Sequence, residues 1–385
     1  MIEKALKGSP KYWGWVFFLL VLIGWGFLCY LRQLSYGLGI TGMSRDISWG
    51  VYIAQFTYLV GVAASAVMLV IPKYLHHYKK YAKVVIFGEF LAIAAVIMCL
   101  LFIVVDVGQP MRILNVLLHP TPNSILFWDM IVLNGYLLIN IIVGYNTLIA
   151  DKKQVPPPGW IKPFIYLSIP WAVSIHTVTA FLYAGLPGRH LWLTAIMAPR
   201  FLASAFASGP ALLLMVLMVI KRVTRFHPDD EALQSLAKTV CYAMIINLFF
   251  MGMEFFTAYY SNIPGHKHPL DYLFFGLHGH DMLVPWMRTA VFLGFVGILI
   301  LLIPPLRRKE GWLAAACASI VAATWTDKGV GLVIGGFIPN PFERITEYHP
   351  TFFEISIAVA IWAIGALILT VLHKLAVWIR EQEVA

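Results

Sequence analysis

Residues 82–105 read AKVVIFGEFLAIAAVIMCLLFIVV, and their only charged side chains are Lys83 and Glu89. About 20 consecutive apolar residues are enough for an α-helix to cross the hydrocarbon core of a bilayer. The whole chain shares this character, because 60% of its residues are hydrophobic and only 12% are charged. Soluble globular proteins carry roughly 25% charged residues. The sequence therefore predicts a protein whose natural solvent is lipid.

Nine further apolar runs have the length of a membrane span. With the first they give the predicted spans 13–34, 50–72, 82–105, 125–149, 161–185, 199–220, 237–261, 284–304, 311–326 and 351–376. The ninth is expected to end at 326, because Asp327 and Lys328 follow directly. We predict an all-α integral membrane protein of about ten transmembrane helices, with residues 1–385 forming a single polytopic domain.

The basic residues predict the orientation of the chain. Its formal net charge is +9, but Lys and Arg lie in short clusters between apolar runs. Topology and anionic lipid explain such clusters, so a nucleic-acid partner is not expected. The N-terminal side and every second loop carry 19 Lys and Arg, whereas the opposite side carries 9. The positive-inside rule therefore places both termini in the cytoplasm, with the protein in the cell membrane.

The outer loops would then be the longer ones, at residues 35–49, 106–124, 186–198, 262–283 and 327–350. Long structured loops on one side indicate a docking surface. Simple connecting loops are the alternative.

The cysteines and histidines bear on which cofactors the chain can hold. Cys29, Cys99, Cys241 and Cys317 all fall inside predicted spans, and none is part of a C-x-x-C pattern. The chain thus offers no motif for an iron–sulfur cluster or a c-type haem. Two b-type haems would need four axial histidines, but only His176 is expected deep in a span. We predict no haem, iron–sulfur cluster or metal site.

A few polar residues inside the spans are the functional candidates, since an ionisable group in the membrane costs several kcal/mol unless it is paired or hydrated. These candidates are Glu89, Asp129, His176 and Glu254, with Asp106 and Arg200 at span ends and Gln55 between Tyr52 and Tyr58. The direction of each span places all of them except Glu89 in the outer half of the membrane.

A quinone site needs an apolar slot, hydrogen-bond partners for the head group and a proton acceptor. His176 suits the last role because imidazole titrates near neutral pH, while Asp129 and Glu254 could orient it or carry protons. Structural alternatives remain open. His176 and Gln55 could simply join helices, and Asp129 and Arg200 could cap or snorkel. Glu89 is either a proton-path carboxylate or one member of a buried pair.

Several short motifs lie in one order along the chain. They are Trp49-Gly50-Val-Tyr52, Asp106-Val-Gly108-Gln-Pro110-Met-Arg112, Phe127-Trp128-Asp129, Ser174-Ile-His176-Thr177, Pro199-Arg200-Phe201 and Glu254-Phe-Phe. Together they resemble the NrfD/PsrC family, the membrane subunits of polysulfide reductase-like complexes. The likeness is to its ten-helix branch, which includes HybB-type subunits, and is greatest to the DsrP-type subunits of sulfite-reduction-associated complexes.

The resemblance implies two four-helix bundles, at 50–185 and 199–326, with a flanking helix at each end, at 13–34 and 351–376. It implies a menaquinol or menaquinone site near the outer face and a docked ferredoxin-like iron–sulfur subunit. Further cytochrome and membrane subunits of a Dsr-type complex would complete the assembly. The chain would thus be a quinol-interacting subunit in electron transport and sulfur metabolism, not a complete enzyme.

The resemblance also implies roles for single residues. Gln55, Asp129 and His176 are expected at the quinol site, with Tyr52, Tyr58 and Arg200 nearby. Glu254, Glu89 and Asp106 are candidates for a proton route. Asp106, Gly108, Pro110 and Arg112 would shape the outer surface or dock the partner. Two other functions remain open, namely a secondary transporter with a polar intramembrane site and a passive anchor without a quinone site.

Overall fold

The computed structural model describes residues 7–63, 65–75 and 79–381. Within these ranges the chain is helical, and one isolated bridge between Leu277 and His280 is the only β-type pairing. The described part of the chain contains ten helices that are long and apolar enough to cross a membrane. The predicted fold class, an all-α membrane protein with ten spans, is therefore confirmed.

The long helices follow one another through the chain. They are α2 (Pro10–Tyr36), α3 (Val51–Ala63), α5 (Val85–Asp106), α7 (Ile125–Lys153), α8 (Lys162–Ala184), α9 (Met197–Val223), α10 (Asp230–Ser261), α12 (Val284–Leu302), α14 (Glu310–Thr324) and α15 (Phe352–Glu381). Shorter elements connect or extend them. These are η1 (Gly37–Ile40), α4 (Val67–Val70), η2 (Ile71–Leu75), η3 (Lys79–Lys83), η4 (Pro110–Arg112), α6 (Asn115–Leu118), η5 (Gly159–Ile161), α11 (Pro264–Phe274), α13 (Pro304–Arg307) and η6 (Trp325–Ile334).

The ninth span corrects the sequence analysis. It was expected to end at 326, but it runs over Glu310–Ile334, because α14 continues directly into η6. Asp327 and Lys328 therefore lie inside the span and not in an outer loop. A drop in hydropathy marks the end of a span only when the charged residues face water, and these two are 4% and 3% exposed. The η6 segment is π-helical, a form that is frequent at functional sites.

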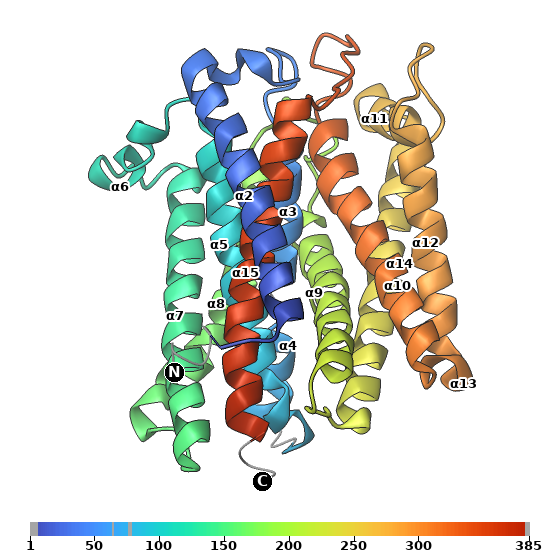
Figure 1. The fold of residues 1–385 in the computed structure, drawn as a ribbon. Helices are drawn as coiled ribbons and strands as arrows, with labels where there is room; N and C mark the ends of the chain where they lie inside the picture. Colours follow the sequence, from blue (N-terminus) through green and yellow to red (C-terminus); the bar gives the residue numbers. More distant parts are fainter. Residues whose placement is uncertain (1–6, 64, 76–78, 382–385) are drawn as a thin grey trace.

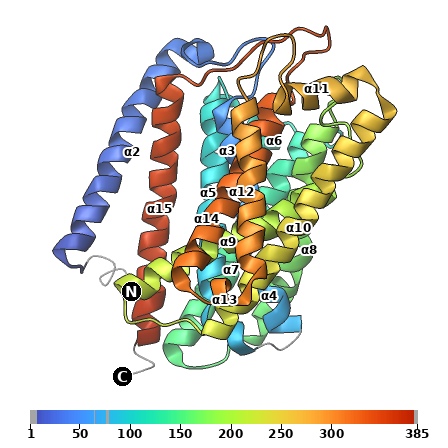
Figure 2. The same cartoon turned by 90° about the vertical axis from the view of Figure 1, so that its right-hand side faces the viewer.

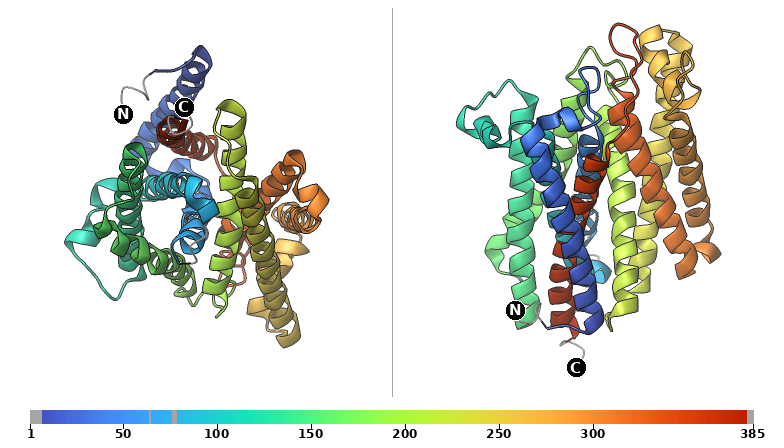
Figure 3. Two further views of the ribbon diagram at one scale, coloured as in Figure 1. Left: turned by 90° about the horizontal axis from the view of Figure 1, so that it is seen from below. Right: turned by 45° about the horizontal axis from the view of Figure 1, so that its top comes forward.

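The helices pack in two rings of four. We call α3, α5, α7 and α8 the first bundle, since each contacts the next and α8 returns to α3. The helices α9, α10, α12 and α14, with η6, form the second bundle in the same way. The α3 helix also packs against α9 and η6, while α15 packs against α2 and α5. The α2 and α15 helices stand at one side of the molecule (Figures 1, 2 and 3).

Burial distinguishes the centre of the molecule from its periphery. In the span that contains α3, 94% of the most apolar window is buried, against 22% in α2. An exposed apolar face at membrane depth is suited to lipid, because lipid tails are as apolar as the side chains of a core. The α3 helix is therefore the shared core of both bundles, and α2 is a lipid-facing helix.

Small residues bring α9 directly against α3. A Cβ atom added to Gly209 would lie only 3.0 Å from the backbone nitrogen of Ser65 and from the backbone oxygen of Val62. Close backbone contact of this kind is the usual way in which membrane helices pack. It places the polar residues of α9 next to the first bundle.

The two ends of the molecule differ in loop content. The end that carries α6 and α11 is called the upper end, and α2 begins and α15 ends at the opposite, lower end (Figure 1). The charge distribution predicts that the upper end faces outwards.

Candidate functional site

His176 is a fully buried side chain of α8. Its Nδ1 atom lies 2.7 Å from the carbonyl oxygen of Ala172, one turn earlier. A carbonyl oxygen only accepts hydrogen bonds, so Nδ1 carries the proton and Nε2 is the basic nitrogen of the neutral ring. Among the residues that the structure describes, none forms a hydrogen bond with Nε2. The ring is thus oriented by its own helix, and it also approaches the backbone of Gly61.

Asp129 lies in the first turns of α7 and faces the side of α8 that carries His176. Its Oδ1 atom accepts a 2.6 Å hydrogen bond from the hydroxyl of Thr179, and both residues are buried. Thr179 follows His176 by three residues, so the two side chains share a helix face. Tyr183, one turn further on, forms a hydrogen bond with Thr57 of α3. The structure therefore gathers Asp129 and His176 at the junction of α3, α7 and α8.

Lys328 reaches this junction from the second bundle. Its Nζ atom lies 3.4 Å from the carbonyl oxygen of Phe201 and 4.2 Å from the centre of the Phe201 ring. A Cβ atom added to Gly61 would lie 3.2 Å from Lys328 Nζ and 3.3 Å from Ser208 Oγ. His176 interacts electrostatically with Lys328 and also approaches the Gly61 backbone. The sequence analysis missed Lys328 because it placed this residue in a loop.

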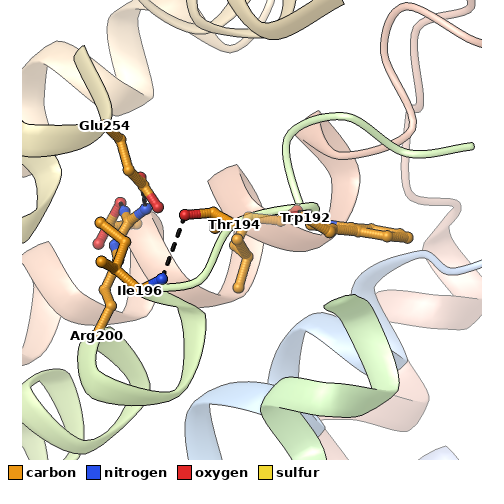
Figure 4. Close-up of polar contacts among 7 residues, drawn as sticks. Trp192, Thr194, Ile196, Arg200 and Glu254 are labelled. Atoms are coloured by element: carbon orange, nitrogen blue, oxygen red, sulfur yellow. Dashed lines mark hydrogen bonds and ion pairs between the residues drawn. The ribbon is translucent and has the colours of Figure 1, made fainter. Parts of the chain in front are cut away.

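Arg200 forms a charged centre within the second bundle. Its Nη2 donates a 2.6 Å hydrogen bond to Asp327 Oδ1, and its Nη1 forms an ion pair with Glu254 of α10. Figure 4 shows the Arg200 and Glu254 side chains pointing toward each other beside the turn that enters α9. In that turn, the backbone nitrogen of Ile196 donates to Thr194 Oγ1 at 3.4 Å. Each charge of this centre is thus paired, as burial requires.

Two small cavities flank the Arg200–Asp327 pair. Each has a volume of about 10 Å³, close to the space that one water molecule needs. One cavity is also lined by Asn247, which is 1% exposed and whose amide atoms have no partner among the described residues. Neither cavity is lined by His176 or Asp129.

One face of α3 carries Tyr52, Gln55 and Tyr58, and this face meets α2, η6 and α15. The Gln55 side-chain oxygen accepts hydrogen bonds from the indoles of Trp325, at 2.9 Å, and Trp362, at 3.0 Å. The Tyr52 hydroxyl bonds to a glutamine of α2, and the Tyr58 ring lies beside Trp362. Gln55 therefore joins α3 to η6 and α15. The structure does not bring these three residues together with His176.

Glu89 lies in the lower part of α5 and is 1% exposed. A Cβ atom added to Gly144 of α7 would lie 3.5 Å from its Oε2 atom. Tyr74, at the lower end of the second span, interacts with it electrostatically. Glu89 is thus separate from the upper polar residues, as its place in the sequence predicted.

The Asp106 motif lies at the upper end. Asp106 is the last residue of α5, and its Oδ1 atom is buried without a hydrogen-bond partner among the described residues. Gly108 and Arg112 lie in the turn that leads through η4 to α6. Asp106 interacts electrostatically with Glu354 of α15, a fully buried carboxylate that the sequence analysis also missed. Glu354 was not taken as a candidate because it lies in the first turn of α15, and acidic residues are common at the ends of spans.

A second buried histidine corrects another expectation. His373 of α15 is 6% exposed, and its ring packs against Phe87 and Phe90 of α5. Only His176 was expected deep in a span. This expectation was wrong because α15 continues to Glu381, beyond the predicted end at 376.

Comparison with known proteins places the chain in a family. An Hdr-like menaquinol oxidoreductase integral membrane subunit of Archaeoglobus fulgidus is 24% identical over 99% of this chain and 97% of the relative. The integral membrane subunit of a menaquinone reductase of Nitratidesulfovibrio vulgaris is 22% identical over 97% and 93%. A Halobacterium salinarum protein named as a membrane subunit of dimethyl sulfoxide reductase is 28% identical over 92% and 89%. Residues 39–336 match the family described as polysulphide reductase, NrfD, and the chain therefore belongs to that family, as its motifs predicted.

Proposed function

We propose that this chain is the quinol-handling membrane subunit of a respiratory redox complex. It binds menaquinol or menaquinone beneath the upper end, exchanges electrons with an iron–sulfur subunit docked there, and releases or takes up protons. Two relatives carry menaquinol oxidoreductase or menaquinone reductase in their names, which supports the proposal. The observation that carries it is the basic Nε2 atom of His176, buried without a partner among the described residues and beside the Asp129–Thr179 pair.

Quinol is the substrate in this proposal, and its oxidation to quinone releases two protons and two electrons. His176 Nε2 accepts a proton from a ring hydroxyl, so that an O–H bond breaks and an N–H bond forms. Asp129, near the start of α7, accepts this proton from His176 and passes it toward the upper end, so that His176 can accept the second proton in the same way. The electrons pass to the iron–sulfur centre of the partner. Quinone reduction follows the same proton and electron transfers in the opposite direction.

The upper end offers the surface for the partner. The turn around Gly108 and Arg112 lies there, beside Asp106 at the end of α5. We propose that this turn contacts the ferredoxin-like subunit and that a Dsr-type complex supplies further cytochrome and membrane subunits, with DsrP the matching subunit type. Asp106, Glu254 and Glu89 remain candidates for proton routes. Glu254 would act with Arg200, to which it is paired.

Quantifying menaquinone in the purified complex tests this function. Lipid extraction is expected to recover menaquinone, and added menaquinol is expected to reduce the iron–sulfur clusters of the partner. A complex that contains no menaquinone and shows no such reduction would contradict the proposal. Solute movement by the isolated chain in vesicles, without any partner, would instead support a transporter.

A further inference from the structure

Lys328 is a buried cation that shares its neighbouring anion, Asp327, with Arg200. Its side chain is 3% exposed, and within the described ranges no carboxylate forms an ion pair with it. The neighbouring carboxylate, Asp327, is instead hydrogen-bonded to Arg200 at 2.6 Å. Besides its electrostatic interaction with Asp327, Lys328 contacts the carbonyl oxygen of Phe201 at 3.4 Å and the Phe201 ring.

These contacts bring no clear gain over an uncharged side chain at this position. A lysine inside a membrane-spanning helix is unfavourable on every insertion scale. A desolvated cation–π contact offsets part of that cost, and a hydrogen bond of 3.4 Å is long and weak. An apolar side chain would fill the same space without this penalty. The charge is therefore expected to serve a ligand that carries negative charge or a strong acceptor.

Three polar groups with unused hydrogen-bonding capacity converge around Gly61. Lys328 Nζ and Ser208 Oγ lie 3.2 Å and 3.3 Å from the position of a Gly61 Cβ. The ring of His176 approaches the Gly61 backbone and interacts electrostatically with Lys328. Both Ser208 Oγ and His176 Nε2 are buried, and neither has a partner among the residues described. Because position 61 carries no side chain, the three groups approach the same point of the α3 backbone, where they can converge on one oxygen atom of a ligand.

We propose that Lys328 is a second head-group ligand of the quinol site, an inference that rests on the proposed function. Its ammonium group donates a hydrogen bond to a ring oxygen of menaquinol or menaquinone. As the proton of that oxygen moves to His176 Nε2, the electron pair of the broken O–H bond stays on oxygen, and Lys328 stabilises the negative charge. Ser208 provides a further hydrogen bond to the same oxygen. The site thus lies between the two bundles and needs both.

The variant Lys328→Met distinguishes a role of Lys328 in ligand binding from a role in stability. Hydrogen bonds from charged donors are worth about 1.5–3 kcal/mol, so binding of a short-chain menaquinone analogue to the purified complex should weaken roughly 10- to 100-fold. The melting temperature should stay unchanged or rise, because an apolar residue of similar length replaces a buried charge. Lys328→Arg keeps the charge and should restore part of the affinity.

Two further variants sharpen the test. Lys267→Met, in the segment after α10, serves as a control and should bind the analogue as the wild type does. Gly61→Ala should weaken binding, because its Cβ atom would occupy the space beside Lys328 Nζ. Unchanged binding by Lys328→Met would overturn the inference and leave the proposed function standing. A joint loss of binding and thermal stability would also overturn it, while a wild-type complex that binds no analogue would refute the proposed function itself.

Discussion

Arg200 donates a 2.6 Å hydrogen bond to Asp327, a residue 127 positions later in the chain. This contact joins α9 to the π-helical segment η6 and neutralises an acid inside the ninth span. Because Arg200 also pairs with Glu254, one guanidinium holds three helical segments of the second bundle together. The acid that was expected to end a span thus stabilises the packing of that span.

Removing Arg200 should be strongly destabilising. Arg200→Ala leaves Glu254 and Asp327 buried without a counter-charge, and breaking a buried ion pair from one side costs about 3–5 kcal/mol. The melting temperature of the detergent-solubilised protein should fall accordingly. The triple variant Arg200→Met, Glu254→Gln, Asp327→Asn removes all three charges and should recover much of the loss. Wild-type stability in Arg200→Ala alone would show that the ion pairs do not support the bundle.

Thr179 should matter to activity more than to stability. Thr179→Val removes the donor that orients Asp129 at 2.6 Å, and we expect quinol-driven reduction of the partner to slow by about tenfold, the equivalent of roughly 1.4 kcal/mol. Thr177 provides a matched control, because its hydroxyl bonds to the backbone of its own helix. Thr177→Val should keep the wild-type rate. Equal rates of reduction in Thr179→Val and Thr177→Val would show that Asp129 takes no part in the proposed proton transfer.

Gln55 should act as a structural link. Gln55→Leu leaves the indole donors of Trp325 and Trp362 without their acceptor, and each buried donor left unsatisfied costs about 1–3 kcal/mol. Thermal stability should therefore fall while the menaquinone content per protein is retained. Trp362→Phe removes one donor only and should have a smaller effect. If Gln55→Leu loses menaquinone while its stability is unchanged, Gln55 is a quinol-site residue and not a structural link.

The crossing of α3 and α9 should tolerate no added side chain. In Gly209→Ala the new Cβ atom would meet backbone atoms of the second span at 3.0 Å, and overpacking of this kind costs about 1–3 kcal/mol. Gly252 of α10 has no heavy atom within 4 Å of its Cβ position. Gly252→Ala should therefore be neutral or slightly stabilising, since alanine favours a helix. Similar melting temperatures for the two variants would mean that the helices do not meet at Gly209.

Labelling of single cysteines should establish the orientation. The positive-inside rule places the upper end outside, so Met111→Cys, at a position that is 92% exposed, should react with a membrane-impermeant thiol reagent in intact cells. A cysteine at Arg308, which follows α13 at the lower end, should react only after the membrane is opened. The opposite labelling pattern would invert the assignment of the two ends.

The ten spans could be predicted from the sequence because a bilayer requires continuous apolar length, a property that neighbouring residues show directly. The bounds of the ninth span could not be predicted. Asp327 can lie inside that span because it is paired with Arg200, which is far away in the sequence. Local hydropathy contains no information about such a pairing.

The candidate site was predictable in part for the same reason. The direction of each span gives depth, which places His176 and Asp129 at similar levels. Depth does not give the helix face, and Gln55 lies on a face of α3 that meets Trp325 and Trp362. Lys328 was missed because its position beside Gly61 depends on how η6 packs against α3.

The most direct test measures how fast added menaquinol reduces the iron–sulfur clusters of the purified complex, in the wild type and in two histidine variants. His176→Leu removes the basic nitrogen beside Asp129, whereas His373→Leu removes the other deeply buried imidazole of the described chain, at the lower end. The account predicts that His176→Leu abolishes the reduction and that His373→Leu retains it. Equal rates in His176→Leu and the wild type would contradict the account.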